Sequence, residues 1–178
     1  MSQNFDLTPG HLPAGATPPT DAALRAFFEA AVRACPEIGP RPVCEVRWIG
    51  LDAESTLQIL ELIRARDKTG TFTLPWIVER TGQPVPRVGA LLVLIDMGGR
   101  PTLMVRTRAV RDVVFGKVTA EDTAVDGSPV RDPAVWVPLH TVYWNALLEP
   151  FGLTVSDDMP FWVEAFELLY DADAGRST

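Results

Sequence analysis

Cysteine and histidine are scarce in this chain of 178 residues, which contains two of each. Two thiols, Cys35 and Cys44, cannot make the disulfide framework that holds small secreted domains together. A structural zinc site needs four ligands at short paired spacings. Cys35 and Cys44 lie nine positions apart, and His11 and His140 do not form a pair beside them. We therefore expect no metal site and no other cofactor.

Long hydrophobic runs are also missing. The longest aliphatic run, residues 90–95, is far too short to cross a bilayer. No lysine or arginine precedes Arg25, and no apolar segment follows the first residues, so the pattern of a secretory signal is absent. These absences predict a cytoplasmic protein without membrane contact.

Positive charge is in deficit overall, with 16 basic and 23 acidic residues and a formal net charge of −7. This balance disfavours a protein that coats nucleic acid, because non-specific binding to phosphates depends on cationic charge. Residues 1–118 carry 14 basic and 12 acidic side chains, whereas residues 119–178 carry 2 basic and 11 acidic side chains. The deficit therefore lies almost entirely in the last third of the chain.

One local stretch runs against this trend. Residues 100–117 hold five basic side chains and one acid, Asp112. Within it, Met104, Arg106 and Arg108 share one face of a predicted strand, which is not typical of a core. Two interpretations stay open. This face binds phosphate groups, or its arginines pair with the acidic last third of the chain.

The composition, 47% hydrophobic and 22% charged, is that of a folded protein. Residues 1–20 contain four prolines and two glycines and predict a flexible tail without regular elements. Residues 21–178 are expected to form a single α+β domain whose strands close a small β-barrel flanked by helices. The patterns predict helices near 21–35, 53–65, 75–80, 120–125 and 132–148, and strands near 43–49, 71–74, 90–96, 102–110 and 161–170.

Several helix starts can be assigned to individual residues. Thr20 or Asp21 is a suitable cap for the first helix, and Thr119 for the short helix near 120. Ser55 and Gln58 have the spacing of a capping box. Asp132 with a proline after it predicts the start of the longest helix.

Lysine is nearly absent, since Lys68 and Lys117 are the only two. Lys68 lies where a helix is expected to end and a strand to begin, among the hydroxyls of Thr69, Thr71 and Thr73. If burial lowers its pKa, such a lysine acts as a base or nucleophile while the hydroxyls hold an anion or a carbonyl oxygen. The simpler interpretation is a lysine at a helix end, stabilised there by the helix dipole.

A series of short motifs, in order along residues 24–170, resembles the ASCH domain family, which has a PUA-like β-barrel. The segment 68–74 resembles the family's Lys-Thr-x-Thr-x-Ser/Thr-Leu motif. The helices before Lys68 suit the longer members and form an N-terminal helical extension. The further matches are Pro86 to Gly89, Arg106 to Val110, Phe115 to Val118, Asp126-Gly127 for Glu-Gly, Trp136 to Trp144, and Val163 to Phe166.

The resemblance implies a cleft beside the barrel that binds RNA or a small nucleotide-derived ligand such as a modified nucleoside. Some members are described as ribonucleases, and small members hydrolyse N4-acetylcytidine without a metal. Carried over from these hydrolytic members, the catalytic residues are Lys68, Thr71 and Asp126. Lys68 attacks or activates the amide carbonyl, Thr71 relays a proton or holds the oxyanion, and Asp126 is the general acid/base or orients Lys68.

The chain departs from the family pattern at two places. Asp126 is one methylene shorter than the family's glutamate, and Ser128 stands where members have a second glutamate. The segment 71–73 lacks the arginine that small amidohydrolases place after the second threonine, so Arg106 or Arg108 is the candidate to supply the cation. A displacement of about 1 Å costs roughly 100-fold in rate, so these departures weaken the amidohydrolase hypothesis.

Further candidate ligand-binding residues are Thr69, Thr73, Trp76, Arg106, Arg108, His140 and Glu164. Trp76 either stacks on a base or belongs to the core. His140 is either a ligand contact or a core histidine beside Trp136. Glu164 shares the parity of apolar neighbours in its strand, so it needs a cationic partner, for which Arg106 and Lys68 are the candidates.

A third hypothesis is a protein-interaction module, based on the proline-rich tail and the acidic last third. No pattern in the chain defines an oligomeric state.

Overall fold

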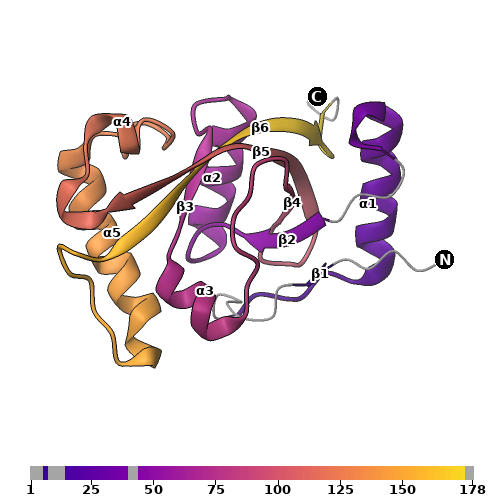
Figure 1. Ribbon diagram of the computed structural model, residues 1–178. Helices are drawn as coiled ribbons and strands as arrows, with labels where there is room; N and C mark the ends of the chain where they lie inside the picture. Colours follow the sequence, from indigo (N-terminus) through magenta and orange to yellow (C-terminus); the bar gives the residue numbers. More distant parts are fainter. Residues whose placement is uncertain (1–5, 8–14, 40–43, 175–178) are drawn as a thin grey trace.

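The computed structural model describes residues 6–7, 15–39 and 44–174, whose strands form one mixed sheet in the order β1-β2-β4-β5-β6-β3. The strands are β1 (Asp6–Leu7), β2 (Cys44–Trp48), β3 (Gly70–Thr73), β4 (Leu91–Ile95), β5 (Pro101–Val114) and β6 (Pro160–Asp171). β1, β2 and β4 are parallel to one another, whereas β5, β6 and β3 are added in antiparallel pairs. The sheet curls into a half-barrel (Figure 1). The predicted α+β class with a small barrel-like sheet is confirmed.

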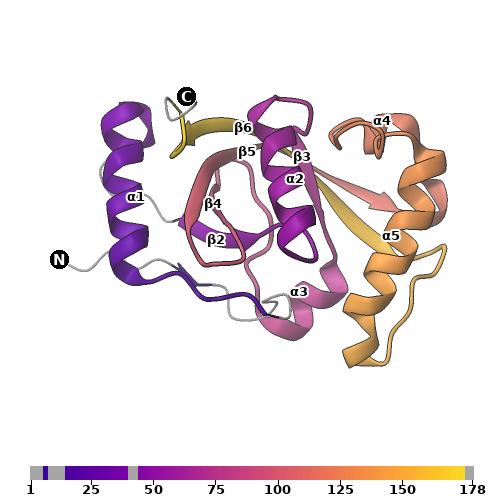
Figure 2. The same ribbon diagram turned by 180° about the vertical axis from the view of Figure 1, so that it is seen from behind.

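Helices cover this sheet on both faces and at one end. They are α1 (Asp21–Ala34), α2 (Ala53–Arg64), α3 (Pro75–Thr81), α4 (Ala120–Thr123) and α5 (Pro133–Leu148), with 3-10 turns η1 (Pro36–Ile38), η2 (Phe115–Lys117) and η3 (Glu149–Phe151). Figures 1 and 2 show α1 and α5 at opposite ends of the molecule, with α2 between them. The helices and strands predicted from the sequence are confirmed to within a few residues at their ends. No helix within the described ranges is long and apolar enough to cross a membrane.

The helix starts follow the local sequence, with one correction. Thr20 caps α1, and Asp132 caps α5 with a proline in the first turn. The capping box predicted from Ser55 and Gln58 is wrong, because the cap of α2 is Asp52. Its carboxylate accepts a hydrogen bond from the Ser55 backbone at 2.8 Å, while the Ser55 hydroxyl receives the Asp52 N–H at 3.1 Å. The box is therefore shifted three residues toward the N-terminus.

The two faces of the sheet have separate cores. α1 covers one face with Leu24, Phe27 and Phe28, and α2 covers the other with Leu60 and Ile63. A third cluster, rich in aromatic rings, lies between α5 and the β3–β6 edge. Residues that are neighbours in one strand therefore lie on opposite faces of the sheet and have different surroundings.

The β5 face that carries arginines is partly core, contrary to the expectation from its sequence. Met104 is fully buried in the cluster under α1. Only past Met104 does the face become polar, where Arg106 is half-buried and Arg108 exposed. The pairing of β5 with β6 is irregular between Thr107 and Ala109, which leaves Arg108 outside the ladder.

The segment 1–20, expected to lack regular elements, contributes the short strand β1 to the sheet edge. Most of this segment lies outside the described residues, and the division into a tail and one domain stays a prediction.

Candidate functional site

Lys68 lies in the turn between α2 and β3. Arg66 adopts a left-handed conformation with φ 58°, and the Lys68 backbone N–H then donates to the carbonyl oxygen of Leu62 at 3.0 Å. This reversal directs the lysine inward, where it is only 5% exposed. Its ammonium contacts the carboxylate of Asp126, with 2.5 Å between Nζ and Oδ1. Lys68 and Asp126 are named here the lysine–aspartate pair.

Backbone and side-chain bonds attach the Asp126 loop to this turn. The Thr69 N–H donates to the Val125 carbonyl at 2.8 Å, and the Gly127 N–H donates to Asp126 Oδ1 at 2.9 Å. Asp67 receives the Ser128 N–H at 2.8 Å and also pairs with Arg131. These bonds bring together two segments that the sequence separates by 57 residues, so the predicted proximity of Lys68 and Asp126 rests on tertiary structure.

Burial makes this lysine chemically unusual. Desolvation lowers the pKa of Lys68, and the negative charge of Asp126 opposes that shift. A buried ion pair contributes little net stability, because desolvation of both charges offsets their attraction. Perturbed, buried titratable groups of this kind concentrate at functional sites. The lysine–aspartate pair is therefore the strongest candidate for chemistry in the described part of the chain.

His140 lies in the aromatic cluster beside this pair. Its ring stacks on Trp136 with 3.9 Å between centroids, and Nδ1 is 3.0 Å from the Trp136 carbonyl oxygen. A carbonyl only accepts, so Nδ1 carries the hydrogen and Nε2 remains an acceptor. Burial lowers the pKa of His140 to about 4, so the ring is neutral at pH 7. This placement is that of a core histidine, and its role toward a ligand stays a prediction.

The burial of His140 predicts that the protein loses stability at acid pH. An unfolded chain protonates it near pH 6.5, whereas the folded protein resists protonation down to about pH 4. Its contribution to the free energy of unfolding is complete above pH 6.5 and is lost as the pH falls toward 4, by roughly 3 kcal/mol in total. Urea unfolding of wild type and His140→Phe at pH 7 and pH 4 measures this difference. An equal loss of stability in both proteins would contradict it.

Glu164 is buried as predicted, but both candidate partners for it were wrong. Its Oε1 accepts from Arg47 at 2.9 Å and from the Thr73 hydroxyl at 2.5 Å. Arg47 also donates to Glu45 at 2.8 Å and to Thr73 at 3.5 Å. Glu164 and Glu45 are 0% and 3% exposed. These four residues, Glu45, Arg47, Thr73 and Glu164, are named the arginine cluster.

Arg47 was missed by the sequence analysis. Glu45 and Arg47 alternate with apolar residues in β2, and this alternation indicates a polar inner face, but no motif singles them out. A role for Arg106 or Arg108 as the replacement for the family's arginine stays a prediction, whereas the cation that contacts Thr73 is Arg47. It reaches Thr73 because the curled sheet brings β2 toward the β3–β6 edge.

The structure places Thr71 apart from the lysine–aspartate pair. Thr71 is paired with Glu164 across β3 and β6, so the two side chains lie on the same face of the sheet. Phe72 lies on the opposite face, where Lys68 Nζ is 5.6 Å from its ring. The Thr71 side chain forms no hydrogen bond with any described residue. Lys68 and Asp126 thus come together, while Thr71 adjoins the arginine cluster, and the catalytic role of all three stays a prediction.

Two other candidate residues lie near β3. Thr69 is exposed, and its backbone bridges Val125 and Phe166. Trp76 is half-buried and packs on the aromatic cluster, as expected for a core residue. Its stacking on a base stays a prediction.

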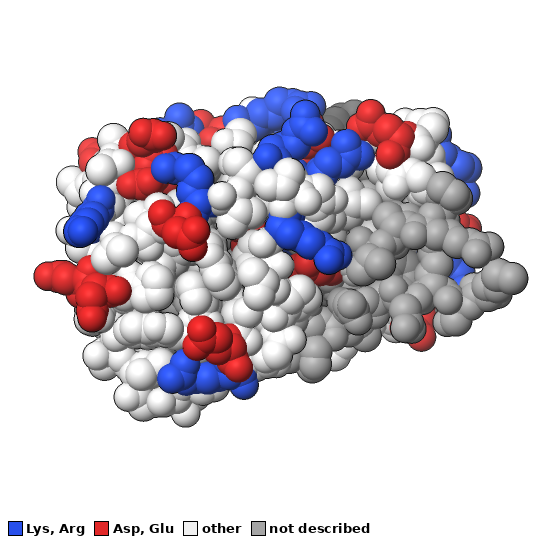
Figure 3. All heavy atoms as spheres, viewed as in Figure 1, with Lys and Arg blue, Asp and Glu red and all other residues white. Residues whose placement is uncertain are grey.

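The arginines of residues 100–117 are neutralised by acids, mostly from the last third of the chain. Arg106 lies 3.5 Å from Glu167 and 3.7 Å from Glu37, and Arg108 lies 3.3 Å from Glu167. Arg111 pairs with Asp122 at 3.0 Å. The interpretation that these arginines pair with the acidic third is confirmed. In Figure 3, blue side chains gather along the upper edge, with red side chains beside and among them.

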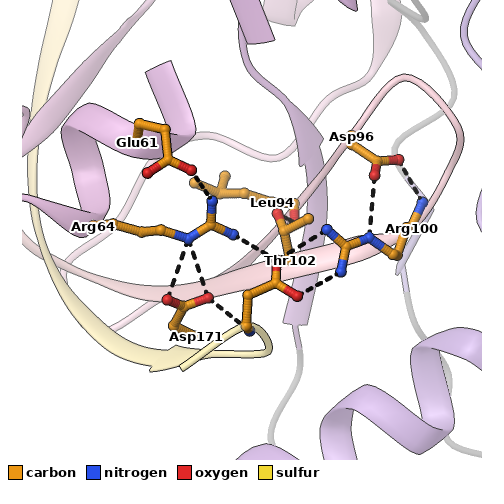
Figure 4. Close-up of polar contacts among 8 residues, drawn as sticks. Glu61, Arg64, Leu94, Asp96, Arg100, Thr102 and Asp171 are labelled. Carbon is orange, nitrogen blue, oxygen red and sulfur yellow. Dashed lines mark hydrogen bonds and ion pairs between the residues drawn. The ribbon is translucent and has the colours of Figure 1, made fainter. Parts of the chain in front are cut away.

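Arg100 belongs to a separate network at the end of β6. It reaches Asp96 at 3.3 Å and Asp173 at 2.9 Å, and Arg64 of α2 reaches Asp171 and Asp173 (Figure 4). Two arginines from distant elements thus converge on one shared carboxylate, that of Asp173. This network joins α2, the β4–β5 turn and the end of β6, which indicates a structural role for Arg100.

No group of three or more His, Cys, Asp or Glu side chains within the described ranges is arranged to hold a metal ion.

Comparison with known proteins places this arrangement in a known fold. A family model described as "ASCH domain" matches residues 47–170. The crystal structure of an ASCH domain from Lactobacillus crispatus JV V101 is similar with a TM-score of 0.76 and 19% identity, over 88% of this chain and 98% of that one. Protein EF3133 from Enterococcus faecalis V583 is similar with a TM-score of 0.75 and 18% identity, over 89% and 95% of the two chains. At such identities the likeness concerns the fold alone. No curated protein matches the chain.

Proposed function

We propose, since this chain belongs to the ASCH domain family, that its lysine–aspartate pair acts on a small modified nucleoside by hydrolysing an acyl amide such as that of N4-acetylcytidine. The observation that carries this proposal is the buried contact of 2.5 Å between Lys68 and Asp126. A buried ammonium beside a carboxylate offers a proton donor and a proton acceptor to the same amide group.

The proposed reaction consumes one water and forms cytidine and acetic acid, which then ionises to acetate. Asp126 takes a proton from the water while the water oxygen attacks the acyl carbonyl carbon. The Lys68 ammonium stabilises the negative oxygen of the tetrahedral intermediate and gives a proton to the departing N4 amine. The carbon–nitrogen bond then breaks, and the proton on Asp126 returns to Lys68. An alternative open from the sequence, attack by an uncharged Lys68, uses the same two residues.

The charges around the site favour a small uncharged ligand over a long RNA. Arg106 and Arg108 have acidic partners, and the arginine cluster holds two carboxylates against one guanidinium. Phosphate binding by RNA needs cations that are free to replace counterions. RNA binding, with or without ribonuclease activity, is therefore the second candidate. It requires an RNA affinity that decreases when Arg106 and Arg108 are both replaced by alanine.

The test is a hydrolysis assay on N4-acetylcytidine with a chelator present. Lys68→Ala is expected to lower kcat/KM by at least about 100-fold, because it removes the general acid. Lys117→Ala is the matched control, since Lys117 is the other lysine of the chain and is exposed. Asp126→Asn is expected to show a comparable loss.

Thermal unfolding of each variant separates loss of chemistry from loss of fold. Full activity of Lys68→Ala would exclude the proposed mechanism. Absence of turnover in wild type would leave RNA binding as the candidate function. A cytoplasmic location is expected under either function.

A further inference from the structure

The outer face of α5 has an unusual composition. The helix spans 16 residues and contains no Lys, Arg, Asp or Glu. Val135, Leu139 and Val142 are 38%, 44% and 74% exposed. The remaining exposed positions of the helix are Ala134, Pro138 and Ala146. Surface helices normally present a polar outer face, and contiguous exposed apolar patches mark interaction sites.

The position of α5 leaves this face open. Figures 1 and 2 both show α5 at one end of the molecule, with the rest of the fold on its inner side. The inner side packs Trp136, His140 and Trp144 against the sheet, so the outer residues are not needed for the core.

We propose that this face pairs with the same face of a second copy of the chain, with the two α5 helices antiparallel about a twofold axis. A twofold interface requires a patch that is complementary to itself. The four larger exposed residues, at 135, 138, 139 and 142, are spaced symmetrically about the point between Pro138 and Leu139. An axis there sets Val135 opposite the partner's Val142, and Pro138 opposite the partner's Leu139.

The charges at the helix ends agree with this orientation. Glu149 is exposed at the C-terminus of α5, where its negative charge is unfavourable to its own helix dipole. In the antiparallel pair it lies near the N-terminal end of the partner helix, where the helix dipole is positive and where the exposed Arg131, which also pairs with Asp67, precedes the helix. A parallel pair would instead place the two glutamates side by side. A charged partner such as nucleic acid finds nothing complementary on a face without ionised groups.

The size of the face sets the expected strength. A helix of this length measures about 24 Å, and one such helix pair lies at the small end of specific interfaces. The dimer is therefore expected to dissociate on dilution. This inference does not depend on the reaction assigned to Lys68.

Sedimentation velocity over a range of protein concentrations tests the pairing. The wild type is expected to shift from monomer to dimer as its concentration rises. Leu139→Glu is expected to remain monomeric with an unchanged thermal transition, because Leu139 is exposed in the monomer. Leu57→Glu, at a leucine of α2 that is 55% exposed, is the matched control and should dimerise like wild type. A wild type that is monomeric throughout, or a Leu139→Glu variant that still dimerises, would overturn the proposal.

Oxidative cross-linking tests the orientation. Cys35 is replaced by alanine, while Cys44 stays, since it is buried and its pKa is raised to about 12. Leu139→Cys lies next to the axis and is expected to form a dimer on oxidation. Val135→Cys should not, because its two copies are about 10 Å apart along the helices, beyond disulfide reach. A mixture of Val135→Cys and Val142→Cys should cross-link, and self-cross-linking of Val135→Cys would rule out the antiparallel arrangement.

Discussion

Replacing Arg47 with methionine is expected to lower the free energy of unfolding by about 3–5 kcal/mol, because it leaves two buried carboxylates without their cation. Glu164 and Glu45 are almost fully buried, and Arg47 binds both. One further oxygen on each carboxylate already lacks a hydrogen-bond partner among the described residues. The Thr73 hydroxyl still donates to Glu164, but a neutral hydroxyl cannot replace the positive charge of the lost guanidinium. Chemical denaturation at pH 7 measures the loss.

Two further variants isolate the cause. Arg25→Met removes an exposed arginine of α1 and should change the free energy of unfolding by less than about 0.5 kcal/mol. The triple variant Glu45→Gln, Arg47→Met and Glu164→Gln removes the charges together and should recover much of the lost stability. If Arg47→Met alone were as stable as wild type, the cluster would not be electrostatically coupled as described.

Replacing Gly70 with alanine is expected to damage both stability and activity. An added Cβ would lie 2.5 Å from the Glu164 carbonyl oxygen and 2.7 Å from the Val125 Cβ. Both are closer than real atoms approach, so either β3 or the loop that carries Asp126 must shift. Overpacking of this kind costs about 1–3 kcal/mol, and a shift of about 1 Å in a catalytic group costs roughly 100-fold in rate. Thermal unfolding and the N4-acetylcytidine assay measure the two effects.

Gly98→Ala is the matched control. Its added Cβ meets only the Asp96 side chain, at 3.3 Å, a contact that a displacement of a few tenths of an ångström relieves. This variant should keep the activity of wild type and nearly all of its stability. A Gly70→Ala protein that behaves like Gly98→Ala would show that the approach of β3 to the Val125 loop tolerates an extra methyl group.

Local patterns predicted the elements well where a few neighbouring residues decide the backbone. The start of α5 follows from an aspartate cap and a proline, both of which act within one turn of helix. The first strand of the hairpin, β4, follows from an apolar run before a glycine pair. The cap of α2 was misplaced by three residues because Asp52 also has capping-box spacing to Ser55, and its carboxylate accepts the Ser55 N–H that Gln58 was expected to satisfy.

The alternation of apolar residues in its strand predicted that Glu164 needs a cationic partner, but it did not identify that partner. The curl of the sheet decides that partner, because it brings Arg47 of β2 over the β3–β6 edge. Arg106, on the opposite face of the sheet, pairs with Glu167 and Glu37 instead. The period of two in a strand predicts the face of the sheet on which a residue lies. The residues of distant strands that it contacts depend on the curvature of the sheet.

Short-range signals in the sequence were sufficient to predict the α+β class, the order of the elements and the family, and they singled out Lys68 as a candidate. All of these depend on short-range periodicity, on capping chemistry, or on motifs that are contiguous in the chain. Three features follow from the tertiary structure alone: Lys68 contacts Asp126, Arg47 pairs with Glu164, and Thr71 lies on the face of β3 opposite Phe72. Contacts between residues that are distant in sequence depend on the conformation of the turns and the curvature of the sheet. Local residue patterns do not specify either.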